Sequence, residues 1–244
     1  MLPKIAIIGY GSMGKEVEKI AIANNIKITE IFDLERKINV NQNYEFDVAI
    51  DFSLPDAVFD NMQIIAKLNK NCVIGTTGWF EHFEKIKKLS IDADIGCVYS
   101  TNFSIGMNYF FKIIEYSSKL LNKIDGYDIM LNEVHHNRKK DSPSGTANTI
   151  ADIIINQYSK KDTINPEKIE GQIPSNQLHI SSTRVGEIVG FHSIWIDSFA
   201  DTIELTHRAK NRSGFAIGAI EAAKWIYNKK GFFDFKECLD NIFE

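Results

Sequence analysis

The chain has 244 residues, of which 44% are hydrophobic and 25% are charged, and its formal net charge at pH 7 is −4. A chain of this length and composition can bury a sizeable core in one large or two small domains, which excludes a largely disordered or collagen-like protein. The negative net charge gives no overall electrostatic footprint for nucleic acid, because phosphate binding requires a basic surface.

The sequence contains no sign of a membrane segment or of a disulfide framework. No apolar stretch reaches the roughly 20 residues of a membrane-spanning helix, and Gly9 and Gly11 interrupt the apolar start too early for a signal peptide. We therefore expect a cytoplasmic protein without a membrane partner. Cys72, Cys97 and Cys238 are widely spaced, so neither disulfides nor a cysteine zinc site is predicted.

The first part of the chain alternates short β-branched runs with amphipathic stretches. The runs predict strands at residues 4–9, 26–32, 46–52, 71–75 and 95–100. The stretches between them predict helices at residues 12–23, 54–68 and 79–89. Because parallel neighbours need a long crossover connection, these repeated units predict an α/β domain with a doubly wound parallel sheet.

The pattern changes after Asn102, where strands follow one another with fewer helices between them. Helices are expected at residues 106–123 and 145–159, and strands at residues 127–136, 177–184, 186–196 and 201–209. This grouping predicts a second, α+β domain with a mainly antiparallel or mixed sheet. An Ala-rich amphipathic pattern over residues 213–231 then predicts a last helix with Ser213 as its N-cap and Gly231 as its stop.

The sequence GYGSMG, residues 9–14, has the GxGxxG spacing and stands between the first expected strand and the first expected helix. Glycines allow the tight turn there, and a helix N-terminus favours the charge of a pyrophosphate. We interpret the motif as a dinucleotide site of the Rossmann type, against the alternative of a purely structural turn. The sequence GTTG, residues 75–78, is expected at the same edge of the sheet, or else forms a plain turn.

Asp33 ends the second expected strand, where a carboxylate would accept hydrogen bonds from the adenosine ribose. A carboxylate repels a 2′-phosphate, which favours NAD over NADP. Arg36 and Lys37 lie close enough to weaken this argument, because a guanidinium could still pair with a 2′-phosphate.

The stretch EVHHNRKKDSPSGTAN, residues 133–148, collects charged and titratable groups beside a helix start. Strand alternation places Glu133 and His135 on one face, so the carboxylate could orient the ring or raise its pKa. Ser142 or Ser144 could cap the helix that begins near Gly145.

The backbone N–H groups of Gly145 and Thr146 would then form an anion pocket at that helix start, next to Arg138, Lys139 and Lys140. A lysine, a helix N-terminus and a titratable histidine suit a small carboxylate substrate that receives a proton. The alternative is a basic surface turn.

The first fifteen residues of this stretch, EVHHNRKKDSPSGTA, resemble the signature E-x-H-H-x-x-K-x-D-[AS]-P-S-G-T-A of the 4-hydroxy-tetrahydrodipicolinate reductases, formerly called dihydrodipicolinate reductases. Similar blocks occur in the family's order over essentially the whole chain: IGYGSMG, DVAIDFSLPDA, VIGTTGW, TNFSIGMN, TRVGEIVGFHSIWI and ELTHRAKNRSGFAIGAIEAAKW. The resemblance implies the NAD(P)H-dependent reduction of (2S,4S)-4-hydroxy-2,3,4,5-tetrahydrodipicolinate to (S)-2,3,4,5-tetrahydrodipicolinate, in diaminopimelate and lysine biosynthesis.

The same resemblance implies roles for individual residues. His135 would be the general acid, Lys139 would bind substrate and assist protonation, and Gly145 and Thr146 would bind a substrate carboxylate in a pocket lined by His136. The implied cofactor-binding residues are Gly9, Gly11, Met13, Gly14, Asp33, Phe52, Gly75, Thr77, Asn102, Phe103 and Arg212, the last near the hinge.

The resemblance also implies how the chain is organised. Residues 1–105 and 213–244 would form the dinucleotide-binding domain, and residues 106–212 the substrate-binding and oligomerisation domain. Members of the family are commonly homotetramers, so the strands within residues 177–209 are expected to form the interface. Leu34 stands where members that use NADP often carry an arginine, which favours NADH, although many members use both cofactors.

Two alternatives stay open at this point. The first is a different imino-acid or amino-acid dehydrogenase of the same architecture, and the second is an NAD-binding sensor without catalysis, which would not need both His135 and Lys139. No metal is expected, because the adjacent His135 and His136 face opposite sides of a strand. His192 and His207 are interpreted as structural or interface residues.

Overall fold

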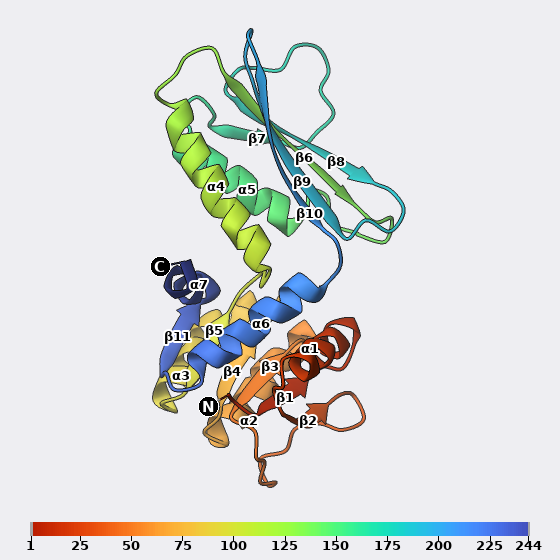
Figure 1. Ribbon diagram of the computed structural model, residues 1–244, viewed down its shortest axis with the longest axis vertical. Coiled ribbons are helices and arrows are strands. Elements are labelled where there is room, and N and C mark those ends of the chain that lie inside the picture. Colours follow the sequence, from red (N-terminus) through yellow and green to blue (C-terminus); the bar gives the residue numbers. More distant parts are fainter. Residues whose placement is uncertain (1, 244) are drawn as a thin grey trace. The chain divides into compact units, whose positions relative to one another are not determined.

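The computed structural model describes residues 2–243, which form two compact units (Figure 1). The first unit contains the chain up to Ile105 and again from Arg212 onward, and the second contains Gly106–Asn211. Arg212 therefore belongs to the first unit and not to the second, where the expected boundary had put it. Among the described residues, no helix has both the length and the apolar character needed to cross a membrane.

The first unit contains a six-stranded parallel sheet in the order β11-β5-β4-β3-β1-β2. The strands are β1 (Ile5–Ile8), β2 (Ile28–Phe32), β3 (Val48–Asp51), β4 (Asn71–Ile74), β5 (Gly96–Tyr99) and β11 (Gly231–Asp234). The prediction of a doubly wound sheet of the Rossmann type is thereby confirmed. The chain order changes direction between β1 and β3, which is where such sheets bind ligands.

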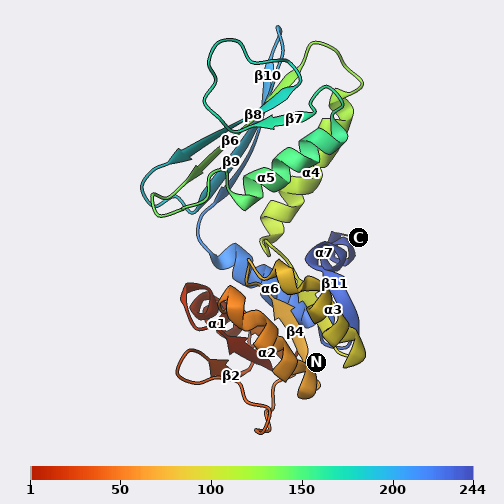
Figure 2. The same cartoon turned by 180° about the vertical axis from the view of Figure 1, so that it is seen from behind.

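Helices cover both faces of this sheet. They are α1 (Ser12–Ala23), α2 (Pro55–Lys67), α3 (Phe83–Asp92), α6 (Ser213–Ile226) and α7 (Phe235–Phe243), with a 3₁₀ turn at Phe80–His82. Helices α1 and α6 lie in front of the sheet in Figure 1, and α2 and α3 lie in front in Figure 2. Successive strand residues alternate between the two cores, so Ile5 and Ile7 pack with α1 and α6 while Ala6 and Ile8 face α2.

The C-terminal part of this unit differs from the expected single helix. Helix α6 ends at Ile226, and the chain continues as β11 and α7, which the sequence pattern did not predict. The side-chain amide of Asn71, on β4, donates to the carbonyl oxygens of Ile226 and Tyr227 at 2.7 and 3.0 Å and so satisfies the helix end. The N-cap of α6 is Arg212, and the prediction of Ser213 as the cap is wrong because its hydroxyl donates to Glu16 instead.

The second unit contains a five-stranded mixed sheet in the order β10-β9-β6-β8-β7. The strands are β6 (Asp128–His135), β7 (Thr163–Asn165), β8 (Gln177–Arg184), β9 (Gly190–Asp197) and β10 (Thr202–Ala209), and the helices are α4 (Ile105–Leu121) and α5 (Gly145–Gln157). Strand β9 is antiparallel to both β6 and β10, whereas β8 is parallel to β6 and β7. The expected mixed sheet is confirmed, and the short β7 was missed.

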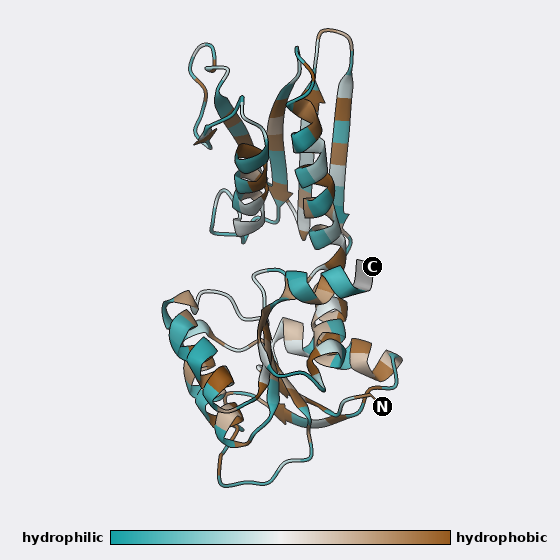
Figure 3. Cartoon of the chain, turned by 90° about the vertical axis from the view of Figure 1, so that its left-hand side faces the viewer, coloured by the Kyte–Doolittle hydropathy of each residue, from teal (hydrophilic) through white to brown (hydrophobic). Residues whose placement is uncertain are grey.

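Helices α4 and α5 pack on one face of this sheet, where their apolar residues join those of β6, β8 and β9 in one core. In both units hydrophilic and hydrophobic residues alternate around the helices (Figure 3). Amphipathic helices of this kind bury one side against a sheet and leave the other to water. The carboxyl end of β6 and the start of α5 therefore lie at one end of a rigid, well-packed layer.

Candidate active site

The residues that follow β1, β2, β3 and β4 meet at one edge of the first sheet, since the carboxyl ends of parallel strands point the same way. Gly9 has a φ of +88°, and a Cβ on it would lie 2.3 Å from the carbonyl oxygen of Phe52. A Cβ on Gly14 would lie 2.2 Å from the carbonyl oxygen of Gly9. Backbone that only glycine can occupy, at a helix start, fits a dinucleotide pyrophosphate.

The neighbouring residues of the motif differ in their surroundings. Gly11 is exposed at the N-cap of α1, where a Cβ would meet nothing within 4 Å. Met13 is partly buried and packs against the core of the first unit. Gly11 is therefore replaceable on steric grounds, whereas Gly9 and Gly14 are not.

Asp33 lies directly after β2 and is exposed. Its Oδ1 accepts hydrogen bonds from the backbone N–H groups of Arg36 at 2.8 Å and Glu35 at 2.9 Å. These two donors, the Arg36 amide first, lower the pKa of the Asp33 carboxyl below its usual value. The group is therefore an anion held in a fixed loop.

Phe52 and Gly75 pack against each other at the ends of β3 and β4. A Cβ on Gly75 would lie 2.2 Å from the ring of Phe52, so the glycine lets the ring lie flat over the loop. Thr77 is exposed beside them, while Thr76 points inward.

Asp51 links the loops after β3 and β4 through hydrogen bonds, and sequence reasoning did not single it out. It is buried at the end of β3 and accepts hydrogen bonds from the Ser53 backbone N–H at 2.8 Å, Asn61 Nδ2 at 3.0 Å and Thr76 Oγ1 at 3.0 Å. Burial raises the pKa of Asp51, and these donors oppose the rise. Its position at a strand end next to Phe52 was the available signal.

Asn102, Phe103 and Arg212 are placed differently from one another. Asn102 is half-buried, and its Oδ1 accepts a hydrogen bond from the Ser104 backbone N–H at 2.9 Å. The Phe103 side chain lies in the core against Phe235, with ring centroids 4.7 Å apart, and the residue as a whole is buried. Arg212 is exposed at the start of α6.

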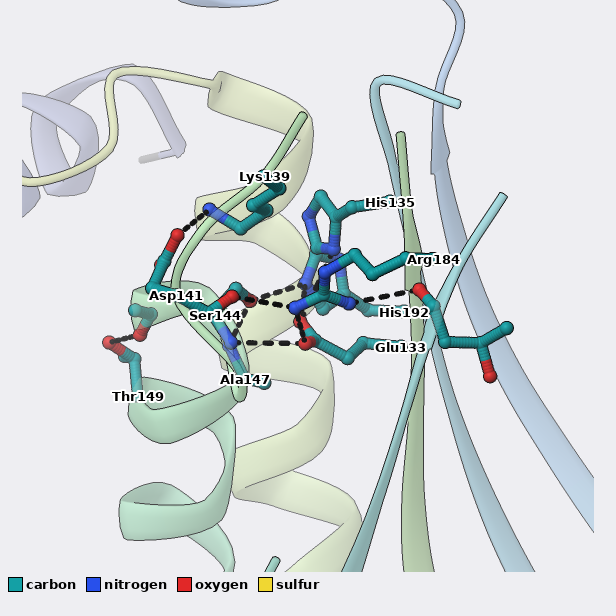
Figure 4. A network of polar contacts seen from close by, with 11 residues as sticks. Glu133, His135, Lys139, Asp141, Ser144, Ala147, Thr149, Arg184 and His192 are labelled. Atoms are coloured by element: carbon teal, nitrogen blue, oxygen red, sulfur yellow. Dashed lines mark hydrogen bonds and ion pairs between the residues drawn. The ribbon is translucent and has the colours of Figure 1, made fainter. Parts of the chain in front are cut away.

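Glu133 stands at the centre of a buried polar network at the carboxyl end of β6 (Figure 4). Its Oε1 accepts hydrogen bonds from the Ser144 backbone N–H and from Arg184 Nη2, each at 3.0 Å. Its Oε2 lies 3.3 Å from His135 Nδ1 and 3.7 Å from His192 Nε2. Burial raises the pKa of Glu133, but the Ser144 and Arg184 donors outweigh it and the net direction is downward.

The two histidines of this network, His135 and His192, are both buried. Their ring centroids lie 5.1 Å apart in an edge-to-face arrangement. Burial is the main cause that lowers the pKa of His135; Glu133 opposes it and Lys139 adds to it. Burial, then His135, lowers the pKa of His192 to about 3. The His135 Nδ1 faces the Glu133 carboxylate, and a Cβ on Gly190 would lie 3.4 Å from Nε2, so this glycine leaves room beside the second nitrogen.

The loop after β6 leads into α5 by way of a serine cap. Ser144 is the N-cap, as one of the two predicted alternatives, and its Oγ accepts the Ala147 backbone N–H at 3.1 Å. Gly145 begins the helix and is exposed, with nothing within 4 Å of a Cβ built on it. Thr146 is half-buried, as is His136 at the end of β6. The helix start at which the anion pocket was predicted is therefore exposed at Gly145.

Lys139 lies on the same loop, and its Nζ forms an ion pair with Asp141 Oδ1 at 2.9 Å. Burial raises the pKa of Asp141, but Lys139, then the backbone N–H of Asp141 itself, then that of Gly145 turn the net direction downward. The Asp141 backbone oxygen accepts a hydrogen bond from Arg184 Nη2 at 2.7 Å, which fixes the loop to β8. The structure thus brings His135, Lys139 and the start of α5 into one site of the second unit (Figure 4).

Two family models match the chain almost end to end: "Dihydrodipicolinate reductase, N-terminus" over residues 3–103 and "Dihydrodipicolinate reductase, C-terminus" over residues 106–239. The chain belongs to the dihydrodipicolinate reductase family.

Two relatives agree with this membership, and one solved structure has a similar fold. The chain is 37% identical to the 4-hydroxy-tetrahydrodipicolinate reductase of Christiangramia forsetii, over 98% of this chain and 99% of the relative. It is 35% identical to the enzyme of that name from Archaeoglobus fulgidus, over 97% and 100%. The fold is similar, with a TM-score of 0.78 at 23% identity over 97% and 99%, to a dipicolinate-bound dihydrodipicolinate reductase from Paenisporosarcina sp. TG-14.

As a member of the dihydrodipicolinate reductase family, the chain is an oxidoreductase that uses a nicotinamide cofactor. The network around Glu133 contains residues that sequence reasoning missed or interpreted otherwise. Arg184 was not singled out, and His192, interpreted as structural or as an interface residue, lies beside Glu133 and His135. His192 stands directly opposite Glu133 in the pairing of β6 with β9, a register that the sequence does not reveal.

Ligand atoms of Glu133, His135 and His192 lie within 4.8 Å of one another, and this set has the composition of a divalent metal site. The sequence had raised a metal only for the adjacent His135 and His136, and predicted none. The guanidinium of Arg184, 3.0 Å from the same carboxylate, already compensates its charge and works against a cation here.

Proposed function

We propose that this chain catalyses the NAD(P)H-dependent reduction of (2S,4S)-4-hydroxy-2,3,4,5-tetrahydrodipicolinate to (S)-2,3,4,5-tetrahydrodipicolinate, with loss of water, in diaminopimelate and lysine biosynthesis. The observation that carries the proposal is the meeting of His135, Lys139 and the exposed start of α5 in one site. A proton donor, a cation and a helix N-terminus suit a dicarboxylate that must be protonated. The names of the two relatives support the same reaction.

In this proposal the side chains of the second unit bind and protonate the substrate. Lys139 and the backbone N–H groups of Gly145 and Thr146 bind substrate carboxylates, and His136 lines the pocket. His135 donates its proton from Nε2, because Glu133 lies against Nδ1 and Gly190, which has no side chain, leaves room beside Nε2. Lys139 also assists protonation. Burial lowers the pKa of His135, and substrate carboxylates would raise it again.

The first unit, with residues up to 105 and from 212, is proposed to bind the dinucleotide. Gly9, Gly11, Met13 and Gly14 would hold the pyrophosphate and Asp33 the ribose. Further contacts are proposed for Phe52, Gly75, Thr77, Asn102, Phe103 and Arg212. The bound nicotinamide supplies the hydride, and the residues of this unit orient it.

NADH is the proposed preferred cofactor, with NADPH as the second choice. The Asp33 carboxylate is held as an anion and would repel a 2′-phosphate. The Arg36 guanidinium, which could attract that phosphate, pairs with Glu30 Oε2 at 2.5 Å and donates to the Ile31 carbonyl oxygen at 3.1 Å. Its charge is therefore already compensated at the end of β2.

We further propose that the second unit assembles the chain into a cytoplasmic homotetramer. Trp195 of β9, Ile203 of β10 and Phe199 in the turn between these strands are exposed apolar side chains. Trp195 and Ile203 point to opposite faces of the sheet, since Ile203 pairs with the buried Ile196, the residue after Trp195. Exposed apolar groups on a sheet and its hairpin support an interface there. Analytical ultracentrifugation tests this point, and a monomer at micromolar concentration would contradict it.

The reaction is tested by following NADH and NADPH oxidation while the preceding condensation of pyruvate with aspartate semialdehyde generates the substrate in place. Rapid, substrate-dependent oxidation is expected, faster with NADH. Cofactor binding without oxidation would contradict the proposal and favour an NAD-binding sensor. Oxidation with another imino acid alone would favour a different dehydrogenase of the same architecture.

A further inference from the structure

The carboxylate subsite of the proposed function already contains a carboxylate of this chain. Lys139 Nζ lies 2.9 Å from Asp141 Oδ1, and the backbone N–H of Gly145 acts on the same carboxylate and lowers the pKa of Asp141. Lys139 and Gly145 are two of the groups assigned above to a substrate carboxylate. A substrate cannot use them fully while Asp141 does.

The surroundings of Asp141 allow its side chain to leave without moving the loop. Its backbone oxygen is fixed by Arg184 Nη2 at 2.7 Å, and Arg184 in turn is fixed by Glu133. The Asp141 side chain is 56% exposed, whereas that of Lys139 is only 23% exposed. A rotation about the Asp141 side-chain bonds would therefore release the ammonium group and move the carboxylate into water.

We propose that Asp141 is an internal ligand of the substrate-carboxylate subsite and that the substrate binds by displacing it. This inference rests on the proposed function. Asp141 keeps Lys139 paired in the free enzyme and selects for ligands whose own carboxylate competes with it. Because the ion pair is half exposed, it is a weak competitor, and its loss should change ligand affinity by about two- to five-fold.

The test is calorimetric titration of the NADH-bound protein with dipicolinate, a planar dicarboxylate. Asp141→Asn keeps the size of the side chain but removes its charge, so dipicolinate should bind about two- to five-fold more tightly than to the unchanged protein. Glu187→Gln is the matched control, because it also removes one carboxylate close to this loop, the one that pairs with Arg138. It should leave the affinity as it is.

Each other outcome has a definite meaning. Equal or weaker binding to Asp141→Asn would overturn the inference and make Asp141 a residue that holds Lys139 in place for the substrate. Equal tightening in both variants would reduce the effect to net charge and overturn it as well. Asp141→Ser, tested in parallel, separates displacement from a new amide contact, since it should also bind more tightly.

Failure of the proposed function gives a different result. If the unchanged protein binds no dipicolinate and oxidises no NADH with the 4-hydroxy substrate, the substrate assignment falls and the inference falls with it. If it shows both activities and the Asp141 variants bind no better, the inference alone falls. Melting temperatures of the variants show whether they are folded.

Discussion

The loops at the edge of the first sheet and the end of β6 in the second unit depend on different kinds of residue. At the first, Gly9 and Gly14 let backbone groups approach within distances that any Cβ would violate. At the second, Glu133, Arg184 and two histidines form a buried network of charged and titratable side chains. The first site therefore requires residues without a side chain, and the second requires charged side chains.

This difference determines how each site should fail. We call the turn that contains Gly9 and Gly14 the glycine edge. A single added methyl group should disrupt the glycine edge, because its backbone atoms cannot move aside without a large energetic cost, whereas loss of a charge near this turn should matter less. In the network around Glu133, an isosteric change that removes charge should be damaging even though packing is kept. Substitutions in the two units can test this contrast one property at a time.

The largest effect is expected for His135→Gln. Glutamine can fill most of the volume of the ring but cannot donate a proton as an acid, so turnover should fall by about 10²–10⁴-fold. NADH affinity, measured by fluorescence titration, should stay the same, because the residues proposed to bind the cofactor lie in the other unit. Unchanged turnover would remove His135 from the role of general acid.

The next effect is expected for Gly14→Ala. A Cβ there would lie 2.2 Å from the Gly9 carbonyl oxygen and 3.2 Å from Ile7, so the loop must shift. Overpacking of this kind costs about 1–3 kcal/mol, which corresponds to about 5- to 150-fold if it falls on NADH affinity. Calorimetric titration with NADH measures it.

Gly214→Ala is the control for that variant, since its Cβ would lie 3.4 Å from Ser104 Oγ, an ordinary contact in helix α6. It should bind NADH as before and be slightly more stable, because alanine favours a helix by about 1 kcal/mol relative to glycine. Equal losses of NADH affinity in both variants would show that the close backbone contact at Gly14 has no particular importance for cofactor binding.

The contrast between the sites also explains what the sequence could reveal. The glycine spacing, the strand alternation at Glu133 and His135, and the Ser144 cap are local patterns, and the structure confirms the turn, the shared strand face and the cap. Arg184 and His192 join Glu133 through the pairing of β6 with β8 and β9, between segments far apart in the chain. No local pattern contains that register.

The missed elements in the first unit have a similar cause. Strand β11 has four residues, GFFD, and forms only because β5 offers a free parallel edge. Helix α6 stops where the side-chain amide of Asn71, more than a hundred residues earlier in the chain, donates hydrogen bonds to the carbonyl oxygens of Ile226 and Tyr227. A helical pattern that continues past Ile226 is overridden by these distant contacts.

A third prediction concerns the charge of Glu133. Glu133→Gln keeps the shape but leaves Arg184 and the histidines without a counter-charge. Because the acid His135 itself stays in place, turnover should fall by only about 10-fold, less than the 10²–10⁴-fold typical of losing the acid. The unfolding free energy should fall by about 3 kcal/mol, as for a buried ion pair that loses one partner. Urea denaturation measures the second quantity.

The pH dependence gives the sharper test of this variant. Glu133 raises the pKa of His135 against the larger effect of burial, so its removal should lower that pKa further. A general acid works only while protonated, and the high-pH limb of kcat/KM should therefore move to lower pH. Glu170→Gln, an exposed change of the same charge, should leave the limb in place; an unmoved limb in Glu133→Gln would make its role purely structural.

The smallest effect is expected for a change of charge at the end of β2, near the glycine edge. Glu30→Gln should release the Arg36 guanidinium, whose side chain is 56% exposed, to pair with a 2′-phosphate. Because exposed ion pairs contribute only about 0.2–1 kcal/mol, kcat/KM with NADPH should rise by about two- to five-fold, while that with NADH stays the same. Adding Arg36→Ala should abolish the gain. A rise that survives in the double variant would mean that Glu30 repels the phosphate directly, and that Arg36 takes no part in the choice between the two cofactors.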